Sequence, residues 1–259
     1  MPDFDTSVPH VARVYDYWLG GKDNFAADRA MGERTLQAYP NLVYSVRANR
    51  AFLARTVRFL ANQGIRQFLD IGTGIPTANN THEVAQGAAP ESRIVYVDND
   101  PIVLSHAKAL LKSTPEGACA YLDADLRDPD TILAGAANTL DFARPVAVML
   151  IAVMHFIGDD AEASAIMNRL MAACVPGSYV ALSHAASDID AVQMAEMIRR
   201  LNESTAEKTT LRDRAGVTRL FDGLELVEPG VIRAAEWRPD TDLETASPAA
   251  LWGGVARKP

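Results

Sequence analysis

The sequence predicts an α/β protein whose core is a mostly parallel sheet with helices on both faces. The first observation is a regular alternation of short apolar runs and helical stretches between residues 65 and 185. Strands that alternate with helices at this spacing are typical of βαβ units, which build parallel sheets. The second observation is the run PVAVMLIAV at 145–153, whose lack of polar alternation indicates a strand buried on both faces. The 259 residues suffice for one large α/β domain with an extension, or for two small domains.

The first part of the chain is predicted to be helical. A helix over residues 11–19 carries a stripe of apolar residues at helical spacing, namely Val11, Val14, Tyr15, Trp18 and Leu19. Gly20 ends this helix, and Asp23 or Asn24 is expected to cap a second one. A third helix covers about 42–60.

We divide the chain into an N-terminal helical cap over residues 1–63 and a core over residues 64–259. The core contains five strand candidates, at 65–72, 93–98, 118–126, 145–153 and 178–184. Helices are predicted between them, including one over 101–111. Two further β-like runs, 221–233 and 249–258, are joined without a crossover helix, so they are expected to form an antiparallel hairpin at the C-terminal edge.

Composition and charge exclude several classes of protein. A net charge of −8 provides no basic face, so nucleic acid is not an expected partner. Cys119 and Cys174 lie in apolar runs and are expected to be reduced, which favours the cytoplasm. The N-terminus lacks the pattern of a signal peptide, and the longest apolar run, PVAVMLIAVMHFI, is too short to cross a membrane. His10, His82 and His106 show no metal-ligand spacing, so no metal is expected.

The stretch FLDIGTGIPTANN at 68–80 carries the strongest functional pattern. A predicted strand ends at Asp70, and Gly72 and Gly74 open the turn into the next helix. Glycines are needed where ligand atoms approach the backbone closely, although an ordinary βα turn also explains them. A dinucleotide fingerprint requires a small third residue where Thr77 stands. The resulting D-x-G-x-G pattern is instead that of S-adenosyl-L-methionine (SAM) sites, in which the acid holds the ammonium group of the ligand.

A second acidic position follows in RIVYVDNDP. Asp98 ends the next predicted strand, 26 residues after Gly72, where a carboxylate can accept hydrogen bonds from both ribose hydroxyls. The alternative is helix capping, because Asn99 and Asp100 precede a proline at a helix start. We assign Asp98 to the ligand and Asp100 to the cap, and we include Asn99 among the cofactor-binding candidates.

A third acidic position follows in YLDADLRDP. Asp125 is expected to accept a hydrogen bond from an adenine amino group while the backbone N–H of Leu126 reaches a ring nitrogen. Asp123 is the alternative, and Asp128 is expected to cap the following helix. Open α/β sheets bind ligands along the edge where parallel strands end, so three such positions on successive strands predict one SAM site.

Five segments carry a resemblance to known proteins: RVYDYWLGGKDNFAADR (13–29), FLDIGTGIPT (68–77), VYVDNDP (95–101), DADLRDP (123–129) and LFDGLELVEPG (220–230). The middle three resemble class I SAM-dependent methyltransferases. The first and last are specific to an actinobacterial S-adenosyl methyltransferase family formerly filed as a domain of unknown function. The resemblance covers nearly the whole chain. It implies a Rossmann-like sheet of seven strands and SAM as cofactor, and it leaves the acceptor open.

The fourth strand candidate ends in IAVMHFIGDD, near the expected acceptor. An Asn/Asp-Pro-Pro-aromatic motif, which many amino-N-methyltransferases carry here, is absent, and this argues against methylation of a nucleobase or glutamine nitrogen. His155 and His184 follow the fourth and fifth strands, and each is a candidate general base for an acceptor hydroxyl. The alternative is that each only hydrogen-bonds a loop, because methyl transfer requires little beyond alignment of the reactants.

The segment RVYDYWLGGKDNF at 13–25 is predicted to cover the active site. Residues off its apolar stripe have no need of the core. Arg13, Tyr17 and Asn24 are therefore predicted to reach the cofactor or the acceptor, and Arg13 is best suited to the methionyl carboxylate.

These observations predict a SAM-dependent methyltransferase that acts on a small molecule, with oxygen favoured as the acceptor atom. One alternative is a non-catalytic SAM-binding regulatory protein, because no acceptor motif is present. Another is an NAD-dependent oxidoreductase, which Thr77 and the absence of a Tyr-x-x-x-Lys pair disfavour. The chain is expected to act as a monomer or homodimer.

Overall fold

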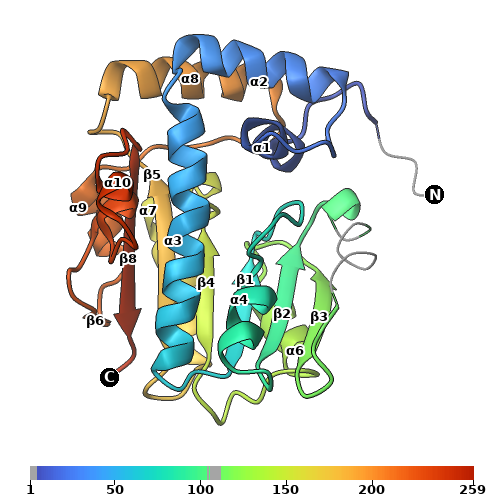
Figure 1. Ribbon diagram of the computed structural model, residues 1–259, viewed down its shortest axis with the longest axis vertical. Coiled ribbons are helices and arrows are strands. Elements are labelled where there is room, and N and C mark those ends of the chain that lie inside the picture. The colour runs from blue at the N-terminus through green and yellow to red at the C-terminus, as the bar shows by residue number, and fades with distance from the viewer. Residues whose placement is uncertain (1–4, 104, 106–111) are drawn as a thin grey trace.

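The computed structural model describes residues 5–103, 105 and 112–259, which fold around one central sheet (Figure 1). The longer helices are α1 (Val11–Leu19), α2 (Ala26–Ala38), α3 (Leu42–Asn62), α4 (Thr81–Ala88), α6 (Pro129–Ala136), α7 (Asp160–Ala172) and α8 (Ala191–Ser204). The short helices are η1 (Met154–Phe156), α9 (Arg214–Arg219), η2 (Ala234–Glu236) and α10 (Asp242–Thr245). The strands are β1 (Gln67–Ile71), β2 (Arg93–Asp98), β3 (Ala118–Asp123), β4 (Ala147–Ile151), β5 (Tyr179–Ala185), β6 (Glu225–Leu226), β7 (Ile232–Arg233) and β8 (Leu251–Arg257).

The sheet has the predicted Rossmann-like arrangement. Within the described residues it contains eight strands in the order β3-β2-β1-β4-β5-β8-β6, and β7 also pairs with β8. Strands β1 to β5 pair in parallel, whereas β8 is antiparallel to β5, β6 and β7. The mostly parallel sheet with an antiparallel C-terminal edge is therefore confirmed. The predicted count of seven strands is one too low, because the run 221–233 forms two separate two-residue strands.

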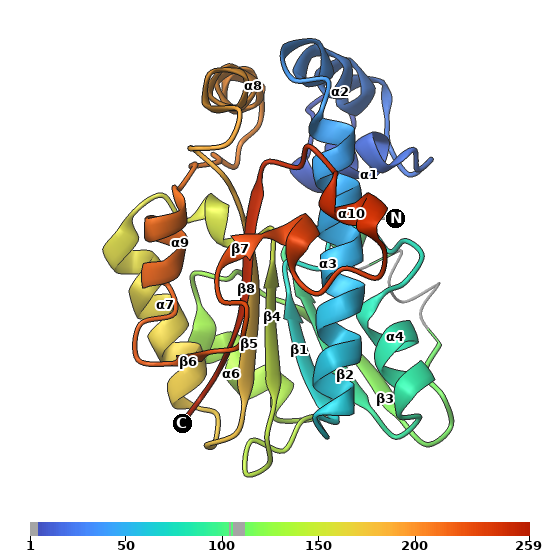
Figure 2. The same cartoon turned by 60° about the vertical axis from the view of Figure 1, so that its left-hand side comes forward.

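Helices cover both faces of the sheet, as the buried strands require (Figure 2). Successive side chains of β1 enter different hydrophobic clusters because strand side chains alternate between faces. Phe68 packs in the cluster that contains Phe52 of α3. Leu69 packs in the cluster that contains Ile132 of α6 and Leu170 of α7. All five residues of β4 are buried, which explains why its sequence shows no polar alternation.

A second group of helices lies beyond the carboxyl ends of the parallel strands, where α2 packs on α8 and α1 lies beneath α2 (Figures 1 and 2). Helix α3 begins in this group and then runs down along the sheet. The cap therefore draws on α8 as well as on residues 1–63, and the division at residue 63 stays a prediction. The start of α2 differs from expectation: Phe25 is its N-cap residue, and the Asp28 carboxylate accepts a hydrogen bond of 2.8 Å from the Phe25 N–H.

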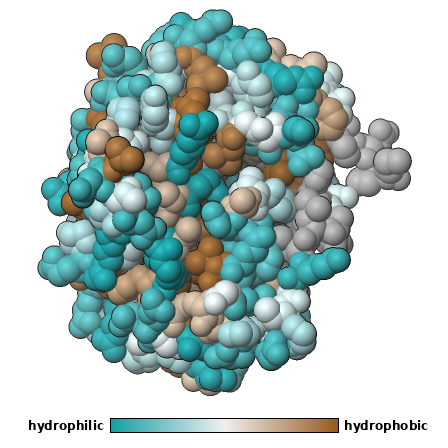
Figure 3. Space-filling model, in the orientation of Figure 1, coloured by the Kyte–Doolittle hydropathy of each residue, from teal (hydrophilic) through white to brown (hydrophobic). Residues whose placement is uncertain are grey.

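Other sequence predictions can be located in the structure. Within the predicted helix over 101–111, residues 101–103 and 105 are helical, and the rest lies outside the described residues. Cys119 and Cys174 are both free, and only Cys174 is fully buried. No helix in the described ranges is long and apolar enough to cross a membrane. Figure 3 shows a mostly hydrophilic surface, with apolar residues visible near its middle, between the upper helices and the sheet.

Candidate active site

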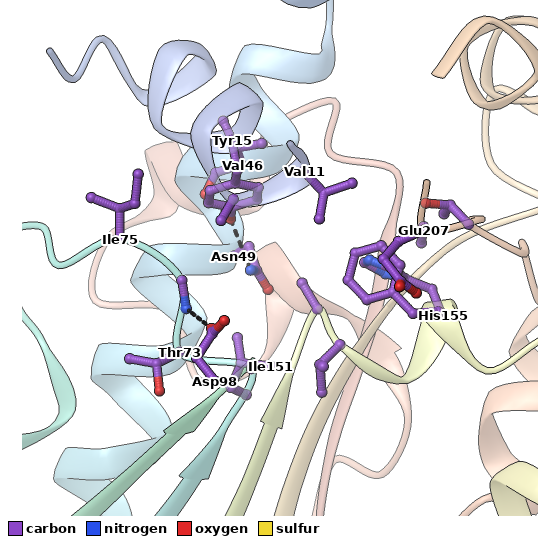
Figure 4. Close-up of a pocket in the computed structure, with 18 of the residues that line it drawn as sticks. Val11, Tyr15, Val46, Asn49, Thr73, Ile75, Asp98, Ile151, His155 and Glu207 are labelled. Carbon is purple, nitrogen blue, oxygen red and sulfur yellow. Dashed lines mark hydrogen bonds between the residues drawn. The ribbon is translucent and has the colours of Figure 1, made fainter. Parts of the chain in front are cut away.

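A cavity of about 210 Å³ lies at the carboxyl ends of β1, β2 and β4, beneath α1, α3 and α8. Figure 4 shows Thr73 and Asp98 at one end, His155 and Glu207 at the other, and Asn49 between them. We call these two regions the glycine-turn end and the His155 end. The three strand-end motifs of the sequence meet at the first of them, because parallel neighbouring strands finish at the same edge of the sheet.

The glycine turn is held tightly against the core. Gly72 and Gly74 have φ angles of 74° and 65°, a left-handed conformation in which a side chain is strained. The Gly72 N–H donates a 2.8 Å hydrogen bond to the carbonyl of Val97. A Cβ at Gly72 would lie 2.6 Å from the Cβ of Val153, whereas a Cβ at Gly74 would meet no atom within 4 Å. The turn therefore packs on one side and leaves open space beside Gly74.

Asp70 lies beneath this turn and lines the cavity. It is only 4% exposed, and the Thr81 hydroxyl donates a 2.6 Å hydrogen bond to its Oδ2. Burial raises the pKa of Asp70 to about 6, against the opposing effects of Thr81 and the Arg50 guanidinium. The carboxyl group is thus still ionised at pH 7 and available to a cationic group.

Asp98 supports the turn from the end of β2. Its Oδ2 accepts a 2.8 Å hydrogen bond from the Gly74 N–H, and its Oδ1 accepts one of 3.0 Å from the Asp100 N–H. Burial raises the pKa of Asp98 above its ordinary value, against these two hydrogen bonds. Because a carboxylate oxygen has two lone-pair sites, each oxygen can still accept a further hydrogen bond from a ligand. Asp100 has the capping role predicted for it, since its Oδ1 accepts a 2.8 Å hydrogen bond from the Ile102 N–H.

The third motif joins the same end of the cavity. Asn99, Asp125 and Leu126 all line it, and the Asn99 side chain donates a 2.9 Å hydrogen bond to Asp125 Oδ2. Asp123 is exposed and is not among the lining residues. Asp128 caps α6 by accepting a hydrogen bond of 3.1 Å from the Thr131 N–H, as the sequence predicted. Asp125 is therefore the better placed of the two candidates for an adenine.

The two histidines occupy different environments. His155 lines the cavity, and its Nδ1 is buried with no hydrogen-bond partner among the described residues. His184 does not line the cavity, contrary to expectation, and both its ring nitrogens are engaged. Arg212 Nη1 lies 2.9 Å from His184 Nε2, and a guanidinium can only donate, so Nε2 accepts and Nδ1–H donates to the Ala185 carbonyl at 2.9 Å.

Burial is the main reason that neither imidazole is charged. It lowers the pKa of His155 to about 3, helped by His184 and Arg212. It also lowers the pKa of His184 to about 4, again with help from Arg212. Bases this weak give little driving force for proton abstraction near neutral pH. His155 can still accept or donate a hydrogen bond through an uncharged ring.

The predicted contacts from the N-terminal segment lie outside the cavity. Arg13 is buried, with its Nε 2.9 Å from Asp28 Oδ2, so its charge is already paired. Tyr17 packs against Gly32 of α2. Asn24 donates a 2.8 Å hydrogen bond to Asp16, which itself lines the cavity. These side chains stabilise the cover and do not contact the space beneath it.

Sequence reasoning overlooked a polar group on α3 that reaches the middle of the cavity. Asn49 donates a 2.9 Å hydrogen bond to the Tyr15 hydroxyl, and its Oδ1 accepts one of 2.5 Å from Ser183. The neighbouring Arg50 donates from Nη2 to the carbonyls of Ala78 and Asn79, at 3.1 and 3.2 Å. Its Nε is buried and has no partner among the described residues. The adjacent polar residues Asn49 and Arg50 in an amphipathic helix were the signal in the sequence. The sequence around them does not show what their side of the helix contacts.

Glu207 was also overlooked. It lines the His155 end from the segment after α8, and its Oε2 accepts a 3.2 Å hydrogen bond from Arg127 Nη2. Arg127 also donates 3.1 Å to the Phe156 carbonyl and lies 3.4 Å from Asp125. The two ends of the cavity are thus joined at its rim by one arginine. No group of three or more possible metal ligands occurs in the described part of the chain.

Solved structures of other proteins are similar to this chain over nearly its whole length. A DUF574 family protein from Streptomyces avermitilis is 45% identical, with coverage of 98% of this chain and 99% of that chain and a TM-score of 0.94. A candidate methyltransferase from Thermobifida fusca is 42% identical, with coverage of 99% and 97% and a TM-score of 0.90. The plantazolicin methyltransferase BpumL in complex with S-adenosylhomocysteine is 10% identical, with coverage of 96% and 95% and a TM-score of 0.50, which indicates a shared fold alone.

A comparison with curated proteins gives no match. The family model described as S-adenosyl methyltransferase matches residues 1–259, the whole chain. The chain therefore belongs to the S-adenosyl methyltransferase family and is a SAM-dependent methyltransferase.

Proposed function

We propose that this enzyme transfers the methyl group of SAM to an oxygen atom of a small-molecule acceptor. The observation that carries the proposal is a single cavity with two unlike ends. The glycine-turn end gathers the three strand-end motifs, and the His155 end lies beneath the helical cover. Membership of the SAM-dependent family removes the basis for the NAD-dependent alternative.

The residues of the glycine-turn end fit the cofactor. Open space beside Gly74 allows a ligand to approach the backbone. Asp98 would accept hydrogen bonds from the ribose, and Asp125 would accept one from the adenine amino group, with Leu126 and Asn99 beside it. Asp70, ionised at pH 7, would hold the ammonium group. When bound, SAM supplies an electrophilic methyl group attached to a sulfonium.

We assign the methionyl carboxylate to Arg50 in place of Arg13. Arg50 lines the cavity and has a buried, unpartnered Nε among the described residues, whereas Arg13 is paired with Asp28. A buried N–H group without a hydrogen-bond partner costs desolvation free energy, and a bound ligand that accepts its hydrogen bond would offset this cost. Arg50 and Asp70 both line the cavity, so they would hold the carboxylate and the ammonium group of the methionyl end between them.

The enzyme would promote the reaction mainly by holding the acceptor in line with the methyl group of SAM. Tyr15, Asn49 and Ser183 form a hydrogen-bonded chain that fixes the middle of the cavity. The uncharged ring of His155 would orient an acceptor hydroxyl by a hydrogen bond, and this supports oxygen as the acceptor atom. We assign no proton transfer to His184, because Arg212 and Ala185 occupy both its nitrogens. Alignment of two reactants alone can supply several kcal/mol of a barrier, on the order of 7–11.

The helical cover excludes water from this alignment. His10 at the start of α1 has its Nδ1 2.8 Å from Asp100 Oδ2, which joins the cover to the end of β2. The Trp18 indole N–H donates a 3.1 Å hydrogen bond to Thr35 of α2, which joins the two cover helices. We infer that residues 1–63 act as this cover together with α8. We also place the enzyme in the cytoplasm, because its two cysteines are free.

Calorimetry with SAM and S-adenosylhomocysteine tests the cofactor site. Both should bind the wild-type protein, and Asp98→Ala should weaken binding at least tenfold, about 1.4 kcal/mol. Absence of binding by both ligands, or an unchanged affinity in Asp98→Ala, would refute the site.

Turnover on a panel of alcohols, phenols and amines of matched size then tests the acceptor atom. Formation of S-adenosylhomocysteine with hydroxylated compounds is expected. Turnover confined to amines would contradict oxygen as the acceptor atom, and cofactor binding without any turnover would favour the regulatory alternative.

A further inference from the structure

We propose that the acceptor is an uncharged and predominantly apolar molecule bound at the His155 end of the cavity. This inference rests on the proposed function, because it assumes that the cofactor occupies the glycine-turn end. Three helices of the cover, α1, α3 and α8, line the cavity, and Glu207 at the His155 end follows α8 by three residues. Apolar residues that these helices contribute to the lining include Trp18 of α1, Val46 of α3, and Met194, Met197, Ile198 and Leu201 of α8.

Helix α8 is amphipathic, and its apolar residues line the cavity. Met194, Met197, Ile198 and Leu201 repeat at i, i+3, i+4 and i+7, and all four are between 2% and 8% exposed while lining the cavity. The outer surface of the helix carries Glu196 and Arg199, which form an ion pair at 2.8 Å. An apolar helix face that lines a cavity favours an apolar occupant, since burial of apolar surface contributes roughly 25 cal/mol per Å². Two methionines also allow the wall to adapt to different ring shapes.

The charged groups near this end are already paired or hydrogen-bonded. Glu207 is bonded to Arg127 at 3.2 Å. Asp16 accepts a hydrogen bond of 3.0 Å from the Asp23 N–H and one of 2.8 Å from Asn24. An anionic acceptor would meet the Asp16 and Glu207 carboxylates, and a cationic one would compete with the groups that already donate to them. Burial of an incompletely compensated charge is strongly unfavourable.

Few polar contacts remain for the acceptor at this end. The Tyr15 hydroxyl accepts from Asn49 and donates to the Val46 carbonyl at 3.3 Å. The amide oxygen of Asn49 is bonded to Ser183. His155 is different, because its Nδ1 has no partner in the described ranges and its ring is uncharged near neutral pH. The geometry thus suits a molecule with a large apolar body and one hydroxyl.

Three probes of the same two-ring shape test the charge preference on the wild-type protein. These are 2-naphthol, 2-naphthoate and 2-naphthylmethylammonium, each titrated by calorimetry into protein saturated with S-adenosylhomocysteine. We expect 2-naphthol to bind at least tenfold more tightly than either charged probe. Equal or tighter binding of a charged probe would overturn the inference, as would the absence of 2-naphthol binding to the saturated protein. Failure of S-adenosylhomocysteine itself to bind would instead refute the proposed function.

A matched pair of variants on α8 locates the binding. Met197→Gln keeps the length of the side chain but places an amide in the apolar wall, and it should weaken 2-naphthol about tenfold. Val192→Gln introduces the same amide on the same helix at a position that is 79% exposed, and it should leave 2-naphthol affinity unchanged. Both variants should retain S-adenosylhomocysteine affinity, which shows that they are folded. Equal 2-naphthol affinity of the two variants would place the probe elsewhere and overturn the inference.

Discussion

Replacement of Gly72 and of Gly74 by alanine should have different consequences, although the two glycines share one turn. Both have positive φ angles of similar size, 74° and 65°. An added methyl at Gly72 collides with the side chain of Val153, whereas one at Gly74 meets open space within 4 Å. We therefore expect Gly72→Ala to act mainly on folding stability and Gly74→Ala mainly on cofactor binding.

The magnitudes follow from the two backbone positions. A non-glycine residue in the left-handed region costs about 1–2 kcal/mol, and this applies to both variants. Alanine recovers roughly 0.4–1 kcal/mol by restricting the unfolded chain. Overpacking against the stiff, β-branched Val153 adds about 1–3 kcal/mol for Gly72→Ala alone. Gly74→Ala should thus lose about 1 kcal/mol of unfolding free energy, and Gly72→Ala about 2–4 kcal/mol.

Urea denaturation followed by circular dichroism measures these losses, and calorimetry measures S-adenosylhomocysteine affinity. The Gly74 methyl would enter the space that the cofactor needs, so affinity should fall about tenfold or more, equal to ~1.4 kcal/mol. Equal destabilisation by both variants would refute the packing of the turn on Val153. Wild-type affinity in Gly74→Ala would refute a close approach of the cofactor to this backbone.

Three further predictions follow from buried polar groups. Because the folded pKa of Asp70 is raised to about 6, its burial penalty on folding stability is absent below its unfolded pKa and complete above pH 6. Below pH 6 the carboxyl group is protonated and loses its charge attraction for the ammonium group of SAM, so SAM affinity measured by calorimetry should fall as the pH drops through 6. Asp70→Asn should lose this dependence. Thr81→Val removes the hydrogen bond from the Thr81 hydroxyl to the buried Asp70 carboxylate and should cost about 1–3 kcal/mol in urea denaturation, whereas Thr81→Ser should stay within about 1 kcal/mol of wild type. Arg212→Met leaves the Met154 and Ile157 carbonyls without this donor and should cost at least about 2 kcal/mol, because an unsatisfied buried acceptor costs about 1–3 kcal/mol. Arg219→Met, on an exposed residue 3.8 Å from the same Asp160 that Arg212 contacts, should change stability by less than about 0.5 kcal/mol. Similar losses from the two arginine variants would contradict this reasoning.

The parts of the site that could be predicted from the sequence are those set by local chain order. Asp70 lies near the end of one strand and the two glycines follow it, Asp98 ends the next strand, and Asp125 follows the third. Parallel strands bring their carboxyl ends together whatever the rest of the chain does. The positions of these residues therefore required only the order of strands and helices.

The rest of the site depends on contacts between distant residues. Arg13 was expected to reach a ligand because its pairing with Asp28, fifteen residues later, depends on how α1 packs on α2. His184 was expected in the cavity because its partner Arg212 lies 28 residues away, beyond α8. Asn49 reaches the cavity only because α3 packs beside β4 and β5. Propensity and spacing do not report such packing, so these assignments required the structure.

Helix α3 constrains how ligands can enter and leave. Its 21 residues span about 30 Å as one uninterrupted helix, from the group of cover helices to the far end of the sheet. Arg55 in its middle donates to the carbonyls of Trp237 and Ala234, at 2.9 and 2.7 Å, which fixes it beside β8. A rotation of the whole N-terminal region about the α3–β1 connection would have to break these bonds. We therefore expect any movement of the cover during ligand exchange to involve α1, α2 and α8, which pack on one another, with α3 as the stationary wall of the passage.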